Sequence, residues 1–149
     1  MKNYTIRPID TTSLAITDAV NLLCANCPNE HERYEKERVF SEVGIIDTPP
    51  FYKVFFGAYH SDGTLIGVGG IKSADWASDT FILYMMAVAE DHRSKGVGSG
   101  LESARIQWMR DKFPHGRCLV STKHKKRFER WDFKIVSEVN SRYLMILEF

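Results

Sequence analysis

The hydrophobic pattern has its clearest signal in the middle of the chain. Residues 81–89 are apolar throughout and contain neither glycine nor proline. Their β-branched and aromatic side chains predict a central strand that is buried on both faces. A glycine-rich loop follows, and from Leu101 the apolar residues recur at helical spacing until Pro114. We expect the fold to be built around this order of strand, glycine loop and helix.

The rest of the chain alternates between strand and helix patterns. Further strands are predicted at residues 4–8, 51–60, 65–71 and 117–121. Helices are predicted from the capping residues 10–13 to Cys27-Pro28, over 29–43, over 101–113 and over 122–131. Because the strand at 117–121 follows a strand and a helix, it can lie parallel to the central strand through a right-handed crossover. Proline at position 8 suits an edge strand.

Length, composition and charge narrow the class of protein. A chain of 149 residues predicts one domain, residues 1–149. Its 44% hydrophobic and 26% charged residues are typical of a globular protein, and the net charge of +1 gives no general attraction to nucleic acid or anionic membrane. No run approaches the ~18 apolar residues of a membrane span, and the first ten residues lack the apolar core of a signal peptide. We therefore expect a cytoplasmic location and no membrane contact.

The glycine loop predicts an anion site. Residues 93–100 read RSKGVGSG, so that unpaired N–H groups of the first helical turn and the helix dipole would favour a phosphate, with Arg93 and Lys95 adding positive charge. A dinucleotide fingerprint needs G-x-G-x-x-G and an acidic residue about 20 positions later, and neither is present. A nucleoside triphosphate loop needs Gly-Lys-Ser/Thr, which is also absent. The plain structural alternative is a glycine turn that only joins strand to helix.

The sequence R-x-x-G-x-G directly after a strand resembles a known family. Residues 86–101, MAVAEDHRSKGVGSGL, are similar to the strand, loop and helix start of the GNAT superfamily of acetyl-CoA-dependent N-acetyltransferases. Residues 128–133, FERWDF, resemble that family's F-Y-E-K-L-G-F signature, and residues 134–136 and 143–149 resemble its closing pair of strands. The first 80 residues match only in the order of elements. The resemblance implies an α+β fold, an α/β sandwich with a mixed, mostly antiparallel twisted sheet of six to seven strands and about four helices on its two faces.

The resemblance also implies a function and a set of cofactor-binding residues. The protein would move an acetyl group from acetyl-CoA to an amine of a small molecule or peptide, by direct attack in a ternary complex. The loop would bind the pyrophosphate, and the exposed backbone of the central strand would pair with the pantetheine arm. These cofactor-binding residues are Met86, Ala87, Val88, Arg93, Ser94, Lys95, Gly96, Val97, Gly98, Ser99 and Phe128. The acidic segment 29–43 would favour a cationic acceptor, although a solvated surface is the simpler explanation of its charges.

The catalytic residues are less well defined than the cofactor loop. Phe128 stands where the family often has a tyrosine that protonates the leaving thiolate, and a phenylalanine cannot donate a proton. No carboxylate lies within 81–89, so the base candidates are Glu90 at the strand end and Tyr84 on the strand, each acting through water. Glu90 also fits a plain surface residue and Tyr84 a core residue. An alternative is therefore a GNAT-like CoA-binding or interaction module with little activity.

Cysteine and histidine positions do not predict a metal site. Cys24 and Cys27 form a C-x-x-C pair with His31 four residues later, but no paired ligands complete a zinc site. The two thiols fit the apolar side of the first helix better than a metal or redox motif. Cys118 fits a buried strand position, and the five histidines show no spacing for a hydrolytic triad.

One local feature concerns partners. Five basic residues would share a helix face if the last helix continued far enough: Lys123, Lys126, Arg127, Arg130 and Lys134. The alternatives are a solvated face whose lysines meet the cofactor phosphate, or a contact for a nucleic acid or a tRNA-linked amine. Strong non-specific binding to nucleic acid usually needs about six to ten phosphate contacts, so nucleic acid is the minor alternative. A homodimer is left open.

Overall fold

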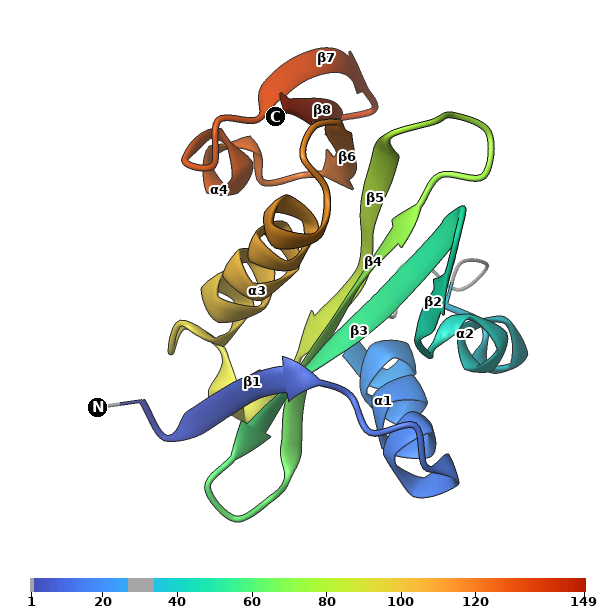
Figure 1. The fold of residues 1–149 in the computed structure, drawn as a ribbon. Helices are drawn as coiled ribbons and strands as arrows, with labels where there is room; N and C mark the ends of the chain where they lie inside the picture. Colours follow the sequence, from blue (N-terminus) through green and yellow to red (C-terminus); the bar gives the residue numbers. More distant parts are fainter. Residues whose placement is uncertain (1, 27–33) are drawn as a thin grey trace.

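The computed structural model describes residues 2–26 and 34–149 and shows one mixed sheet of eight strands (Figure 1). The strands are β1 (Tyr4–Pro8), β2 (Ile46–Thr48), β3 (Phe51–His60), β4 (Leu65–Ser73), β5 (Thr80–Val88), β6 (Arg117–Thr122), β7 (Lys134–Val139) and β8 (Arg142–Glu148). Their order is β1-β3-β4-β5-β6-β8-β7, with β2 beside β3. Among the described pairs only β5 and β6 run parallel. This confirms the mixed, mostly antiparallel sheet, to which the unpredicted β2 adds an eighth strand.

Helices cover both faces of the sheet. They are α1 (Ser13–Asn26), α2 (Lys36–Glu42), α3 (Val97–Lys112) and α4 (Lys125–Glu129). Successive residues of β3 point to opposite faces, so Phe55 packs with α1 and α2 while Val54 and Phe56 pack on the α3 side. Figure 1 shows the same division, with α1 and α2 on one side and α3 and α4 on the other. The sheet therefore separates two hydrophobic cores.

Three glycines in β4 let other groups approach the sheet closely. A Cβ added at Gly67 would lie 2.9 Å from a Val97 methyl carbon on α3, and one at Gly69 would lie 3.2 Å from the Arg105 guanidinium. A Cβ at Gly70 would instead lie 2.7 Å from the Phe55 ring on the opposite face. The absence of side chains at these positions thus accommodates a helix on one face of the sheet and an aromatic ring on the other.

A β-bulge interrupts the central strand. Val68 pairs with Ala87 and Gly70 pairs with Tyr84, so that one β4 residue faces two residues of β5. Met85 lies at the bulge with φ of +47°, a left-handed conformation that costs about 1–3 kcal/mol for a residue with a Cβ. Because of the extra residue, Met85 joins the core on the α1 side while Met86 packs on the α3 side.

The two parallel strands separate soon after they begin to pair. The register of β5 with β6 covers only Thr80–Ile82 against 117–119, and β6 then continues beside β8 as far as Thr122. The second half of β5 therefore has no neighbouring strand on this side within the described residues. This separation opens the middle of the sheet where the glycine loop begins.

Several predicted limits differ from the observed ones. The helix that was predicted over 101–113 begins at Val97, because the glycine loop already forms its first turn. The last helix is only Lys125–Glu129 rather than 122–131. Of the segment 29–43, the described helix is Lys36–Glu42, and Cys27 and His31 lie outside the described residues. Within the described chain, none of the helices combines the length and apolar character that a membrane crossing requires.

We expect Gly70→Ala to lower the free energy of unfolding by about 1–3 kcal/mol, because the new methyl group must displace the Phe55 and Tyr84 rings. The matched control is Gly44→Ala, since a Cβ at Gly44 has no described neighbour within 4 Å. Urea unfolding of both variants measures the difference. Equal midpoints for the two variants would contradict the close packing around β4.

Candidate active site

A cavity of about 380 Å³ lies where β5 and β6 separate. Its walls come from β5 at 83–86, from β6 at 120–122, and from residues of α3, α4 and β8. A second cavity of about 250 Å³ adjoins it and shares residues such as Tyr84, Met85 and Ser121. The two cavities place the predicted residues Tyr84, Met86 and Phe128 around one opening through the sheet.

The glycine loop lies next to two residues that line the larger cavity, since a Cβ added at Gly98 would lie 2.7 Å from Arg127 Nη2 and 3.7 Å from Met86 Cε. Ser94 and Gly96 have positive φ values of 61° and 84°, and α3 begins directly after them. The first backbone bond of the helix is from Gly100 N–H to the Gly96 carbonyl at 3.0 Å, so the N–H groups of residues 97–99 precede it. No acidic residue lies in the first turn of α3. The loop therefore has the geometry and the field of an anion site.

The basic side chains of the glycine loop form hydrogen bonds within the chain. Arg93 Nε donates to the Val88 carbonyl at 3.1 Å, and Arg93 Nη2 donates to Asn26 Oδ1 at 2.7 Å. Lys95 Nζ donates to the Asp91 carbonyl at 3.0 Å. Arg93 thus ties the end of β5 to α1. An anion at this place would be recognised chiefly by backbone N–H groups, with the two cations contributing long-range charge.

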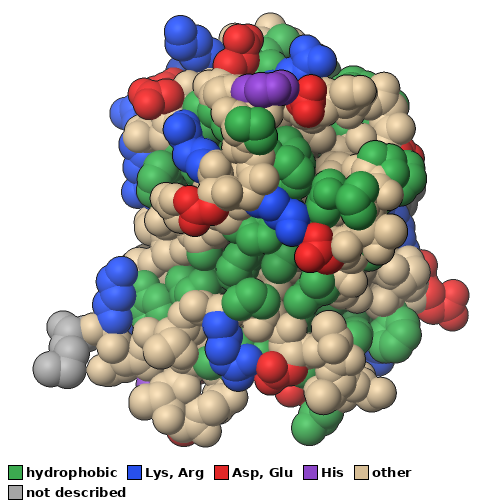
Figure 2. Space-filling view, viewed as in Figure 1, with side chains coloured by type: hydrophobic (Ala, Val, Ile, Leu, Met, Phe, Trp, Pro, Cys, Tyr) green, Lys and Arg blue, Asp and Glu red, His purple; other side chains and the backbone are tan. Residues whose placement is uncertain are grey.

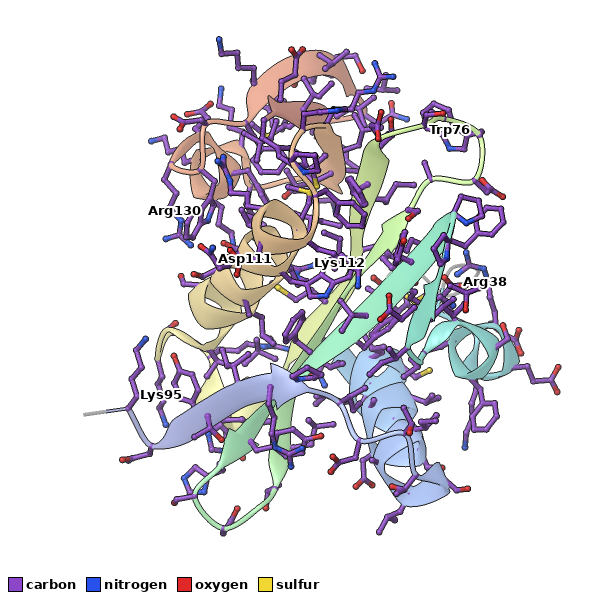
Figure 3. All side chains as sticks on the ribbon, viewed as in Figure 1. Arg38, Trp76, Lys95, Asp111, Lys112 and Arg130 are labelled. Carbon is purple, nitrogen blue, oxygen red and sulfur yellow. The ribbon has the colours of Figure 1, made fainter. Side chains whose placement is uncertain are left out.

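A buried carboxylate fastens α4 to α3. Glu102 is fully buried, with Arg127 Nε 2.5 Å from its Oε1 and Arg130 Nη2 2.8 Å from its Oε2. Arg130 also donates to Ser99 Oγ at 2.8 Å, so it contacts the first turn of α3 (Figure 3). Three ionic and polar contacts therefore position α4 beside the glycine loop. A Cβ at Gly98 would lie 2.7 Å from Arg127 Nη2, which shows how closely the two elements meet.

These contacts correct the predicted cationic stripe. The helix ends at Glu129, and Lys134 belongs to β7 instead. Arg127 and Arg130 face Glu102 rather than solvent alone. On the α3 face, basic and acidic side chains are interspersed and hydrophobic side chains show between α3 and β3 (Figure 2). The five residues therefore do not form one continuous basic face.

Arg105 is buried beneath the bulge in β5. Its Nη1 donates to the Gly70 carbonyl at 3.0 Å, its Nε to the Leu101 carbonyl at 3.1 Å, and its Nη2 lies 3.1 Å from Met86 Sδ. Burial lowers the pKa of Arg105 to about 10, so the guanidinium stays charged at neutral pH. The side chain therefore compensates a carbonyl next to the bulge and supports the strand that lines the cavity.

Sequence reasoning did not single out Glu102 or Arg105 as site residues. Arg105 lies four residues after the buried Leu101, and Glu102 lies four residues before the buried Ile106. Residues four apart on a helix share a face. A charged pair on the apolar face is the signal that could have identified them.

The candidate Tyr84 forms a polar network on the α2 side. Its hydroxyl donates to Glu42 Oε1 at 2.6 Å, and Lys72 Nζ lies 2.8 Å from the same oxygen. Burial raises the pKa of Tyr84 far above its ordinary value, and the hydrogen bond to Glu42 raises it further. Burial opposes ionisation of Glu42, but hydrogen bonds from Lys72 and Tyr84 lower its pKa. Tyr84 is thus a hydrogen-bond donor at neutral pH, and its part in catalysis stays a prediction.

The other candidates are placed differently. Glu90 is exposed in a 3-10 turn, Glu90–His92, and does not line either cavity. Phe128 is buried, lines the larger cavity and packs edge-on against Phe133 with ring centroids 5.5 Å apart. Among the described residues that line the two cavities there is no Asp or Glu. A base supplied by this lining would therefore have to act without a carboxylate.

The thiols offer little reactivity. Cys118 is fully buried, and burial raises its pKa to about 12. Burial also raises the pKa of Cys24, whose Sγ donates to the Tyr34 carbonyl at 3.2 Å. In residues 2–26 and 34–149, no three His, Cys, Asp or Glu side chains gather as a metal site would require.

Glu102→Gln is expected to lower the free energy of unfolding by about 1–3 kcal/mol, because the amide cannot balance the buried Arg105 or hold both α4 arginines. Asp111→Asn on the exposed side of α3 is the control, with a change within about 0.5 kcal/mol. Chemical denaturation followed by circular dichroism measures both. A Glu102→Gln protein as stable as the control would contradict a structural role for this carboxylate.

Comparison with known proteins supports the fold and the family. PaiA N-acetyltransferase from Thermoplasma acidophilum, solved in complex with coenzyme A, has a TM-score of 0.68 and 16% identity over 99% of this chain and 100% of that one. The ribosomal-protein-S18-alanine N-acetyltransferase of Escherichia coli has a TM-score of 0.73 and 12% identity, covering 97% and 93%. No curated protein matched significantly. The family model described as Acetyltransferase (GNAT) family matches residues 16–127, and the chain therefore belongs to the GNAT acetyltransferase family.

Proposed function

We propose that the protein transfers the acetyl group of acetyl-CoA to an amine of a small molecule or a peptide, in one step within a ternary complex. The observation that carries this proposal is the opening between β5 and β6, whose lining residues Met86 and Arg127 lie next to Gly98 of the glycine loop. The thioester would enter this opening from one face of the sheet and the amine from the other.

The chain's own residues would bind coenzyme A through main-chain groups and an apolar wall. The N–H groups of residues 97–99 would receive the pyrophosphate at the start of α3. The side of β5 that has lost its neighbour offers the backbone of Met86, Ala87 and Val88 to the amide-bearing pantetheine arm, as an added strand would be bound. Phe128 provides an apolar wall. A side chain at position 98 would enter the space between the glycine loop and Arg127, which Gly98 leaves free.

The transfer step requires a neutral amine. Its nitrogen attacks the thioester carbonyl carbon, a C–N bond forms, the C–S bond breaks, the amine loses a proton and the leaving thiolate gains one. A backbone N–H near Val88 would polarise the thioester oxygen. A lysine-like amine has a pKa of about 10.4, about 3.4 units above pH 7, so its deprotonation at pH 7 costs roughly 4.6 kcal/mol. An α-amino group has a pKa near 8, and its pKa lies only about one unit above pH 7. With no described carboxylate in the lining, water is the proton acceptor that we infer.

A second candidate function is CoA binding with little transfer. Phe128 favours it, because this side chain has no hydroxyl to protonate the leaving thiolate. Two described phenols line the larger cavity, Tyr34 and Tyr84, and the Tyr84 hydroxyl already donates to Glu42. An assay of CoA release across a panel of amines separates the two functions. Binding of acetyl-CoA without release of CoA in the presence of any amine would favour the binding module.

We expect Gly98→Glu to abolish acetyl-CoA binding, because the new carboxylate would occupy the anion site and meet the narrow space beside Arg127. Isothermal titration calorimetry with acetyl-CoA measures the affinity. Gly44→Glu adds the same side chain where a Cβ has no described neighbour within 4 Å and should bind like the wild type. Unchanged affinity in Gly98→Glu, or no affinity in the wild type, would contradict the proposal.

Cys118→Ala should retain the rate of acetyl transfer, since a thiol with its pKa raised to about 12 is not a nucleophile at neutral pH. Steady-state kinetics and intact-protein mass spectrometry after mixing with acetyl-CoA provide the two readouts. An acetylated cysteine that forms and decays at the turnover rate, together with an inactive but folded variant, would replace direct transfer by a covalent route.

A further inference from the structure

We propose that His124 carries the proton that the attacking amine loses and delivers it to the leaving thiolate. This inference rests on the proposed function and assigns both proton transfers to one residue of this chain. His124 lies directly before α4 and lines the larger cavity together with Phe128, which is four residues later in α4. The imidazole therefore belongs to the same wall as the phenylalanine, which has no proton to donate.

The lining of the larger cavity offers few groups that can exchange a proton near neutral pH. An imidazole can accept and donate a proton in this range, whereas charged lysine and arginine side chains only donate and tyrosine ordinarily ionises well above it. Among the described residues, no aspartate, glutamate or cysteine lines the cavity. The other titratable residues of the lining come from α3 (Arg105), α4 (Arg127), β5 (Tyr84), β8 (Arg142) and the segments before α2 (Tyr34) and α4 (Lys123). His124 is therefore the described side chain of this lining that suits proton transfer.

The backbone of His124 is fixed on both sides, and its ring is not. The His124 N–H donates to Thr122 Oγ1 at 3.0 Å, and the His124 carbonyl accepts from the Arg127 N–H at 3.2 Å. Among the described residues, the ring forms no hydrogen bond, ion pair or aromatic contact. The residue is exposed, so water reaches the ring. The imidazole can therefore turn about its side-chain bonds while its backbone keeps its place at the cavity.

Arg127 connects His124 to the cofactor end of the cavity. Its N–H bonds to the His124 carbonyl, and its side chain binds the buried Glu102 of α3. The same side chain lies next to Gly98, where an added Cβ would be 2.7 Å from Arg127 Nη2. A cofactor bound at the glycine loop would therefore extend past Arg127 into the cavity that His124 lines.

A single imidazole can serve both atoms, because the nitrogen and the sulfur are bonded to the same carbon in the tetrahedral intermediate. The amine forms the C–N bond and loses one proton to a water, which passes it to the neutral imidazole. The C–S bond then breaks, and the imidazolium gives that proton to the thiolate. The imidazole is neutral again, one proton has moved from nitrogen to sulfur, and no further reactant is consumed.

The kinetic test replaces the imidazole with an amide of similar size. With saturating acetyl-CoA, His124→Gln should lower kcat for CoA release about 100-fold, while the acetyl-CoA affinity by calorimetry stays within about twofold. His115→Gln is the matched control, because His115 is exposed between α3 and β6 and lines neither cavity. The control should keep the wild-type kcat. Equal kcat for the two variants would overturn the inference.

Two further readouts separate proton transfer from a structural role. The wild-type kcat should fall toward acidic pH, because an imidazolium cannot accept a proton, and the profile of His124→Gln should be flatter. In His124→Ala, added imidazole should restore part of the rate after the rate without protein is subtracted, whereas it should not change His115→Ala. Profiles of the same shape for wild type and His124→Gln would overturn the proton shuttle.

Chemical modification tests the position of the ring without turnover. Diethyl pyrocarbonate acylates accessible, uncharged imidazoles, and peptide mass spectrometry identifies each modified histidine. Saturating coenzyme A should prevent modification of His124 and leave that of His115 unchanged. Equal modification of His124 with and without coenzyme A would overturn its placement beside the cofactor.

The outcomes distinguish the shuttle from the proposed function. If acetyl-CoA binds and no amine of the panel releases CoA from the wild type, the proposed transfer fails, and the shuttle fails with it. If the wild type transfers the acetyl group and His124→Gln does so at the same rate, the shuttle alone is overturned.

Discussion

The early separation of β5 and β6 is the constraint on which the rest of the structure depends. Only three residues of β5 pair with β6, although β6 continues as a strand beside β8. Beyond Ile82, the edge of β5 that faced β6 has no neighbouring strand among the described residues, although helices cover both faces of the sheet. Unpaired backbone groups are costly when no partner or water reaches them. In this chain a cavity lies beside the unpaired part of β5, and α3 begins soon after β5 ends. An extended, anionic ligand would therefore find two sets of main-chain donors, those of β5 and those of the first turn of α3.

A connected series of charged contacts keeps this opening in shape. The bulge at Met85 places one β4 residue against two of β5, and Arg105 donates to the Gly70 carbonyl beside it. A fully buried guanidinium needs compensation, and Glu102, one turn earlier on α3, supplies opposite charge. Glu102 in turn binds Arg127 of α4 and Arg130, which directly follows α4. Removal of one member of a buried ionic group usually costs more than the group contributes as a whole. The positions of β5, α3 and α4 around the cavity are therefore coupled.

The parts of the fold that could be predicted from the sequence are those determined locally. Gly96 and the apolar run before it specify strand, turn and helix through their own conformational preferences, and that order predicted the anion site. The bulge at Met85 could not be predicted in the same way, because it depends on the register with Gly69 rather than on the preference of methionine. The cationic stripe was predicted from helical spacing alone, whereas Arg127 and Arg130 are directed by a tertiary partner, Glu102. Local chemistry thus predicted the place of the anion site, and long-range pairing determined the geometry of the opening.

Main-chain recognition also explains where specificity can reside. The chain shares its fold with acetyltransferases at only 12–16% identity, which is expected if the cofactor end needs glycines and backbone N–H groups more than particular side chains. The side chains that line the opening are then free to differ between proteins with a common fold. In this chain they combine an apolar Phe128, a phenol that is held by Glu42, and arginines at the α2 side. Such a lining cannot remove a proton with a carboxylate of its own. The proton acceptor must then be water or a side chain other than a carboxylate, such as His124, which lines the larger cavity on the α4 side.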